Sequence, residues 1–175
     1  EYCKLTINRV DSVKVLLKQI DKEGAIGEIY YFLHLLHRSD IFNTNDKTII
    51  QLRNAGGMRL ISNKIVSDTI IAYYRAVDFI RFLYEEQTEF RRSLRPLFPK
   101  ILDGNYYGNY LDSNNAPVRS IAPAQLRITE PDIINTLLIT LTNIRGINNR
   151  VKNVVSELRE NAKDTRILIM DEYRL

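Results

Sequence analysis

The chain has little of what builds a disulfide scaffold or a metal centre. Its 175 residues include one cysteine, Cys3, and two histidines, His34 and His37. A lone cysteine forms no disulfide within the chain, which excludes the cross-linked frameworks of small secreted domains but leaves an extracytoplasmic location open. A zinc site needs three or four protein ligands, and no Cys, His or Glu cluster accompanies the two histidines. We therefore expect no metal and no cofactor.

Long apolar runs are also absent. A helix that spans a bilayer needs about 20 mostly apolar residues, and the longest candidates, residues 133–141 and 167–170, fall well short. The chain begins at Glu1 rather than Met. This start favours a removed N-terminal segment that held a signal peptide or a membrane anchor, although removal of a purification tag explains it equally well.

Known catalytic sequence patterns are missing as well. No nucleophile elbow or Ser-x-x-Lys pattern surrounds a serine, and Cys3 lacks the neighbours of a catalytic thiol. The pair Gly56-Gly57 is not followed by the lysine of a phosphate-binding loop. Adjacent acids such as Glu85 and Glu86 point in different directions on a helix and do not share a site. The sequence predicts that the protein is not an enzyme.

The composition that remains is that of a folded globular protein. Hydrophobic residues make up 45% of the chain and charged residues 26%, so long disordered tails are not expected. The length predicts a single domain over residues 1–175. The formal net charge is +4, but acids are interleaved with bases through most of the chain, so nucleic acid is not an expected partner.

Apolar residues recur at three- and four-residue spacing through most of the chain, which is the period of amphipathic helices. The predicted helices cover about residues 5–20, 29–36, 46–55, 62–92, 129–162 and 167–173. No segment alternates apolar and polar residues between hairpin turns, so no sheet is expected. The predicted fold class is all-α, an antiparallel helical bundle of about four principal helices with short extra helices and one long loop.

A few residues predict where these helices begin and end. Gly56 should end the third helix in a left-handed conformation. Ser62 or Asn63 should cap the long helix that follows, and Thr129 should cap the last long helix. Asn148 places a polar group on the apolar stripe of that last helix, where it needs a hydrogen-bond partner and would set the register against a neighbouring helix.

Two groups of residues are candidate binding sites. A basic group near the end of the long helix would contact phosphate or anionic lipid, although cations are also favoured at a helix C-terminus without any ligand. Its members are Arg91, Arg92 and Arg95. An aromatic group in the loop over residues 103–128 is suited to adaptable recognition of a partner, although these tyrosines could equally fold back over the bundle. Its members are Tyr106, Tyr107 and Tyr110.

One motif resembles a known family. Residues 51–64 read Q-L-R-N-A-G-G-M-R-L-I-S-N-K, and Tyr73-Tyr74 follows. This stretch resembles an uncharacterised family of small bacterial proteins, a domain of unknown function with the pattern Q-L-x-x-x-G-x-x-x-L-I-S-N-K and then a Tyr-Tyr pair. The resemblance covers about residues 46–75 and the ending 172–175. Ile65 departs from it, since relatives often carry an acid there, and the Tyr-rich loop has no match.

The resemblance implies a single-pass membrane protein whose basic N-terminus and transmembrane helix precede this domain. The positive-inside rule then places the domain on the extracytoplasmic, periplasmic face of the inner membrane. We expect a non-enzymatic interaction or ligand-sensing domain that uses the bundle surfaces and the 103–128 loop, with an unknown protein or small molecule as partner. The motif itself would be structural, with the short helix ending at Gly56 and with Leu60 and Ile61 filling the bundle.

The alternative function is an intracellular helical module. It would use Arg91, Arg92 and Arg95 to bind nucleic acid or phosphorylated partners, and such binding would weaken as salt is raised.

Overall fold

The computed structural model describes residues 1–38, 44–127 and 130–174. In these ranges the chain is helical, with no β-strand and two isolated β-bridges, Leu102 with Leu126 and Leu111 with Pro117. The predicted all-α class is confirmed. The helices, where η denotes a 3-10 helix, are α1 (Tyr2–Leu16), α2 (Ala25–Leu36), α3 (Lys47–Asn54), η1 (Gly57–Leu60), α4 (Lys64–Arg92), η2 (Arg95–Leu97), α5 (Phe98–Ile101), α6 (Gly104–Tyr107), η3 (Gly108–Tyr110) and α7 (Pro131–Tyr173).

Three helices differ from the prediction, and one of them, α2, begins at Ala25 instead of residue 29. The first helix ends at Leu16 instead of Ile20, and the turn after it contains Gly24 in a left-handed conformation with φ of 77°. The last helix, α7, is unbroken to Tyr173 and joins two segments that were predicted separately. No glycine or proline lies between residues 163 and 173 to interrupt its backbone hydrogen bonds. The predicted cap Thr129 lies outside the described residues.

The chain divides into two compact units, which we call unit 1 and unit 2. Unit 1 consists of residues 1–40 and 85–150, and unit 2 of residues 41–84 and 151–175. Both α4 and α7 contribute residues to each unit. The expectation of a single domain over residues 1–175 stays a prediction.

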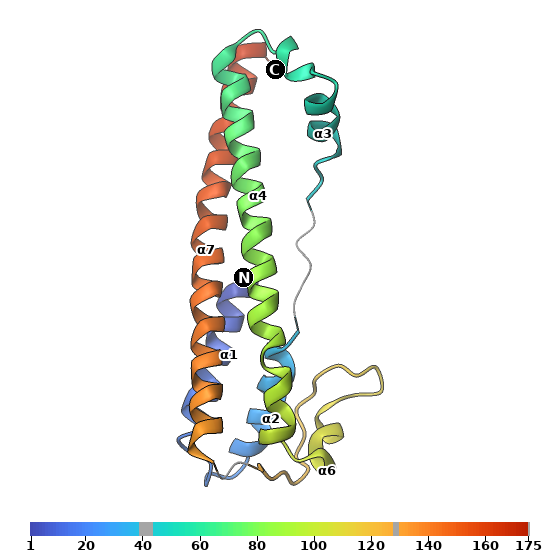
Figure 1. Cartoon of the computed structure of the whole chain (residues 1–175), viewed down its shortest axis with the longest axis vertical. Coiled ribbons are helices and arrows are strands. Elements are labelled where there is room, and N and C mark those ends of the chain that lie inside the picture. Colours follow the sequence, from blue (N-terminus) through green and yellow to red (C-terminus); the bar gives the residue numbers. More distant parts are fainter. Residues whose placement is uncertain (39–43, 128–129, 175) are drawn as a thin grey trace. The chain divides into compact units, whose positions relative to one another are not determined.

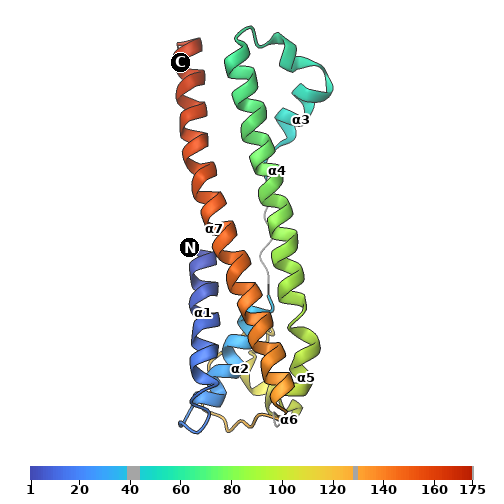
Figure 2. The ribbon, with the colours of Figure 1, turned by 60° about the vertical axis from the view of Figure 1, so that its left-hand side comes forward.

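The large apolar core lies in unit 1. Its buried cluster includes Val10, Val13, Ile29, Leu33, Leu94, Leu137, Leu141 and Ile144. In Figure 2, α1 runs alongside the N-terminal half of α7, and two polar contacts accompany this packing: Lys14 Nζ donates to Thr142 Oγ1 (2.8 Å), and Arg145 pairs with Asp11 (3.0 Å). The helices of unit 1 therefore bury the periodic stripes that the sequence shows.

The polar residue on the stripe of α7 has the partner that its position requires. Asn148 is fully buried, and its Oδ1 accepts a hydrogen bond from Gln87 Nε2 at 2.8 Å. Its Nδ2 donates to the carbonyl oxygen of Ile144 at 2.7 Å. The pair links α7 to α4 within unit 1, which confirms that Asn148 needs a partner on a neighbouring helix.

Unit 2 is built from α3, η1, most of α4 and the end of α7. Figure 1 shows α3 beside the first part of α4. Its buried apolar residues are Ile49, Val66, Val77, Ile80, Leu83 and Val151. Many other apolar side chains of this unit stay exposed, including Ile50, Leu60, Ile65, Phe82 and Ile167. Unit 2 therefore leaves much apolar surface in contact with water.

The motif that begins at Gln51 is partly as predicted. Gly56 has φ of 68° and precedes η1, and Asn63 Oδ1 caps α4 by accepting from the amide of Ile65 at 2.9 Å. The expectation that Leu60 fills the bundle is wrong, because this side chain is 86% exposed. The turn η1 packs inward through the buried Gly57, and the chain leaves it extended at Ile61, so Leu60 stays on the outside.

The segment 103–128 is an ordered connection over its described residues. Asp103 caps α6 by accepting from the amide of Asn105 at 2.9 Å. Asp112 Oδ1 accepts from the amides of Asn114 and Ala116 and so closes a tight turn. Short helices and side-chain caps thus replace the structureless loop that the composition suggests.

Candidate functional site

The tyrosines of the 103–128 segment fold back onto the helices of unit 1. Tyr110 is buried, stacks on Tyr30 with ring centroids 5.0 Å apart and donates its hydroxyl to the carbonyl of Ala122 at 2.9 Å. Burial raises the pKa of the Tyr110 hydroxyl. Tyr106 and Tyr107 are half-buried, and the ring centroids of Tyr107 and His34 are 4.3 Å apart. Tyr110 therefore anchors the segment, and partner binding by Tyr106 and Tyr107 stays a prediction.

The three arginines do not form one surface, which corrects their grouping as a single basic site. Arg91 is 1% exposed and donates to the carbonyl oxygens of Leu36 (3.1 Å) and Arg38 (2.6 Å) and to Thr6 Oγ1 (3.0 Å). It satisfies carbonyls at the end of α2, as a cation there is expected to do. Arg92 and Arg95 are exposed. Anion binding by this pair stays a prediction.

The two histidines lie in an aromatic cluster with Phe98 and Tyr107. Their ring centroids are 6.2 Å apart. His34 is buried, and burial lowers its pKa to about 4, while burial also lowers the pKa of His37. In the part of the chain that the structure describes, no group of three or more His, Cys, Asp or Glu side chains is placed to hold a metal ion.

None of the helices in the described ranges combines the length and the hydropathy that crossing a bilayer requires.

A groove lies in unit 2 between α3, α4 and α7, and we call it the unit 2 groove. Its volume is about 420 Å³. Its described lining residues are Thr48, Ile49 and Leu52 from α3, Ile70, Tyr73 and Tyr74 from α4, and Ala162, Thr165, Arg166, Ile169 and Met170 from α7. Each set follows the three- and four-residue spacing that places side chains on one face of a helix.

The α3 wall depends on a close backbone approach. Ile49 is buried, whereas Leu52 is exposed where it lines the groove. A Cβ atom on Gly57 would lie 2.9 Å from Leu52 Cδ2 and 3.2 Å from the Leu52 carbonyl oxygen. Only glycine fits there without moving Leu52, so the glycine pair both turns the chain and shapes this wall.

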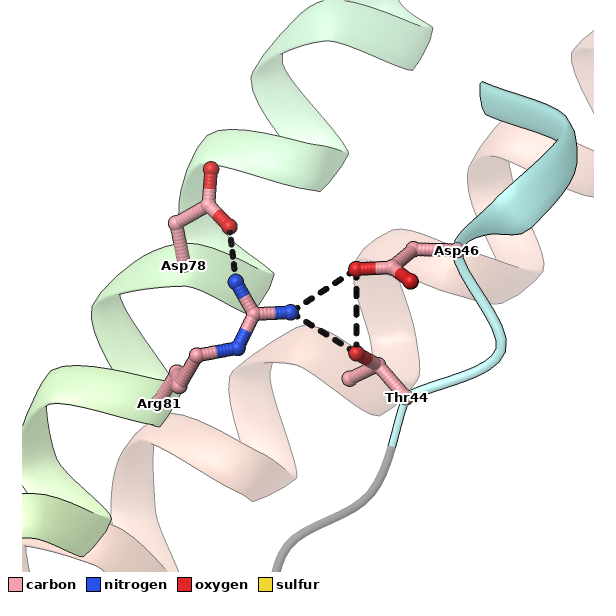
Figure 3. A network of polar contacts seen from close by, with 4 residues as sticks. All are labelled: Thr44, Asp46, Asp78 and Arg81. Atoms are coloured by element: carbon pink, nitrogen blue, oxygen red, sulfur yellow. Dashed lines mark hydrogen bonds and ion pairs between the residues drawn. The ribbon is translucent and has the colours of Figure 1, made fainter. Parts of the chain in front are cut away.

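A polar network holds the start of α3 against α4, and we call it the clasp (Figure 3). Arg81 Nη2 donates to Thr44 Oγ1 at 2.7 Å and to Asp46 Oδ2 at 2.9 Å. Arg81 Nη1 donates to Asp78 Oδ1 at 2.8 Å, and Thr44 Oγ1 donates to Asp46 Oδ2 at 3.2 Å. One guanidinium therefore joins the residues just before α3 to the middle of α4.

The α4 and α7 walls are mainly apolar with hydroxyl groups among them. The rings of Tyr73 and Tyr74 meet nearly perpendicularly, with centroids 5.1 Å apart. Burial, and then the neighbouring Tyr73 and Asp46, raise the pKa of the Tyr74 hydroxyl. Thr165 Oγ1 donates to the carbonyl of Asn161 at 2.7 Å, so its own helix satisfies this hydroxyl.

The walls of the groove carry apolar and hydroxyl-bearing side chains. The described lining residues include no carboxylate, histidine or thiol. They do supply apolar walls, which bind by removing apolar ligand surface from water. The arrangement therefore fits a binding site.

The groove was not predicted from the sequence. Its lining is contributed by three segments that are far apart in the chain, and helical periodicity alone does not show which faces meet. The available signals were the Tyr73-Tyr74 pair and Leu52, which belong to the motif stretch.

Comparisons with protein-family models, curated proteins and solved structures find no match to this chain.

Proposed function

We propose that this chain is a non-enzymatic binding domain that takes up an apolar ligand in the unit 2 groove. The observation that supports this function is the groove itself, with about 420 Å³ between walls that are mostly apolar. Ligand sites in proteins are typically clefts of about 300 to 1,000 Å³, lined by apolar and aromatic side chains with a few polar groups that orient the ligand. The unit 2 groove matches this description in volume and in lining.

The exposure of the walls supports the same function. Leu52 and Met170 both line the groove and are 39% and 37% exposed. Covering such side chains with an alkyl group contributes about 0.8 kcal/mol for each buried CH₂. The walls thus present exposed apolar surface that a ligand can remove from water, with a favourable free energy of binding.

We also propose that the domain belongs to a membrane-anchored bacterial protein and senses its ligand on the extracytoplasmic face of the inner membrane. The support for the location is the resemblance of residues 46–75 to the uncharacterised bacterial family. Leu52, Tyr73 and Tyr74 of this stretch also line the groove. Fractionation of the full-length protein tests the location. We expect it in the membrane fraction with this domain accessible to protease from the periplasm, and a cytosolic, unanchored protein would contradict the proposal.

Binding of neutral alkyl chains tests the groove. We expect 1-octanol, 1-decanol and 1-dodecanol to bind with affinity that rises about fourfold for each added CH₂ until the groove is filled, since about 0.8 kcal/mol corresponds to that ratio. Isothermal titration calorimetry of the purified chain measures these affinities. Absence of binding by all three alcohols would refute the function.

A pair of variants on α7 locates the site. Met170→Asp places a carboxylate in the lining, where a bound alkyl chain would remove it from water, so we expect at least about tenfold weaker 1-dodecanol binding. Ile167→Asp is the matched control, because Ile167 is 57% exposed and does not line the groove. Equal losses in the two variants would place the binding elsewhere.

A further inference from the structure

Building on this proposed function, we infer that the ligand of the unit 2 groove is a single-chain anionic amphiphile. Its alkyl chain would lie between the apolar walls, and its carboxylate would meet the guanidinium of Arg166. The juxtaposition that points to this ligand class is one exposed cation among otherwise uncharged, mostly apolar lining residues.

Arg166 has no acidic neighbour to neutralise it along α7. The residues three and four positions away are Ala162, Lys163, Ile169 and Met170, none of which is an acid. Lys163 pairs with Glu160 at 2.8 Å. In the described ranges no ion pair involves Arg166. Its charge is therefore available to a ligand.

The other walls bring no competing negative charge into the groove. Asp46 lies near Tyr74, but its carboxylate accepts from Arg81 and Thr44 within the clasp. The hydroxyl groups of Thr48, Tyr73 and Tyr74 are further potential donors on the lining. The polar side chains of the described lining thus supply one cation and three hydroxyl groups that can donate, and no carboxylate, which suits an anionic head group.

Charge and volume together narrow the ligand class. A cationic amphiphile would be repelled by Arg166, whereas a carboxylate accepts two parallel hydrogen bonds from the planar guanidinium. Because Arg166 is exposed, water and salt screen this pair. A volume of about 420 Å³ lies near the lower end of known ligand sites, which favours one alkyl chain over the two chains of a phospholipid.

Competition between head groups on one chain length tests the inference. The probes are dodecanoate, 1-dodecanol and dodecyltrimethylammonium, each titrated below its micelle concentration into the purified chain at slightly alkaline pH. We expect dodecanoate to bind up to about fivefold more tightly than 1-dodecanol at low salt, because an exposed ion pair contributes up to about 1 kcal/mol. The difference should shrink as salt is raised, and the trimethylammonium compound should bind most weakly.

Two charge-matched variants on α7 assign the head-group contact. Arg166→Gln should lower dodecanoate affinity to that of 1-dodecanol while leaving 1-dodecanol affinity unchanged, which also shows that the groove stays folded. Arg159→Gln, an exposed position outside the lining, should leave both affinities unchanged. Arg166→Lys should restore part of the preference for dodecanoate.

The outcomes separate this inference from the function on which it rests. If 1-dodecanol binds in the groove as tightly as dodecanoate, or if Arg159→Gln abolishes the preference as Arg166→Gln does, the anionic ligand class is refuted and the apolar binding function stands. If none of the three probes binds, the binding function itself is refuted.

Discussion

Buried polar side chains in unit 1 show how single residues specify packing. Asn148 and Gln87 meet in the interior, and Asn148 also donates to the backbone of its own helix. Leaving one such group without a partner costs about 1 to 3 kcal/mol. A shift of α7 along α4 would separate these amides, so the pair favours one register over others that would bury the same apolar stripes.

His34 makes the stability of the fold sensitive to pH. Its pKa is about 4 in the folded chain, against 6.5 for an unperturbed histidine, because the buried ring disfavours the charged form. Between pH 4 and pH 6.5, His34 is therefore mostly protonated in the unfolded chain and mostly neutral in the folded chain. We expect stability to fall as pH is lowered from about 6.5 to about 4, by roughly 3 kcal/mol from this residue.

The variant His34→Phe isolates that contribution. Phenylalanine keeps the contacts with Phe98 and Tyr107 but does not titrate. Urea denaturation at several pH values should show a smaller loss of stability in the variant than in the parent chain. The other titratable groups are the same in both proteins, so the difference between the two curves reports His34. Parallel curves would contradict the assignment.

At the scale of elements, α3 has little packing of its own to hold it in the groove. It is eight residues long and contains one buried side chain, Ile49. Isolated helices of this length are not stable in water. Its position therefore depends on the clasp before it and on the glycine turn after it.

Removing the guanidinium of the clasp tests this dependence. We expect Arg81→Ala to speed amide hydrogen exchange in residues 47–54 and to weaken 1-dodecanol binding several-fold. Global stability should fall by less than about 1 kcal/mol, because Arg81, Asp46 and Asp78 are partly exposed to solvent.

Arg75→Ala is the control, since Arg75 is also exposed on α4 and is not one of the four clasp residues. If this variant weakens binding as much as Arg81→Ala, the effect comes from net charge and not from the position of α3.

At the scale of the whole molecule, apolar burial is uneven. The large buried cluster consists of unit 1 residues, whereas the apolar side chains of unit 2 are often exposed. Local opening costs least where few apolar contacts are lost. We expect hydrogen exchange along α7 to be slow over residues 137–151 and clearly faster over residues 155–173.

A ligand in the unit 2 groove should change this profile. A molecule that binds the folded groove stabilises it by mass action, so saturating 1-dodecanol should slow exchange over residues 47–54 and 162–170 and leave residues 137–144 nearly unchanged. Exchange followed by mass spectrometry measures each segment. Uniform protection along α7 without ligand would contradict the uneven burial described here.

The groups that were placed wrongly from the sequence are those whose environment is made by distant segments. Arg91 reads as part of an exposed basic run, yet its partners are Thr6, Leu36 and Arg38 on other elements. Leu60 reads as core, yet the path of the chain after η1 leaves it in solvent. Hydropathy and spacing do not contain this information, because neither carries the positions of segments more than a few turns away.

By itself the sequence determined the helical class, the approximate helices and their local ends. Spacing sets the apolar stripe, and Gly56 and Asn63 act through the backbone within a few residues of themselves. The tertiary structure alone decided which faces meet, so it alone showed the groove between α3, α4 and α7 and the presence of Arg166 in its lining. Helical periodicity depends on residues a few positions apart, whereas a binding site is formed by side chains from distant segments that come together only on folding.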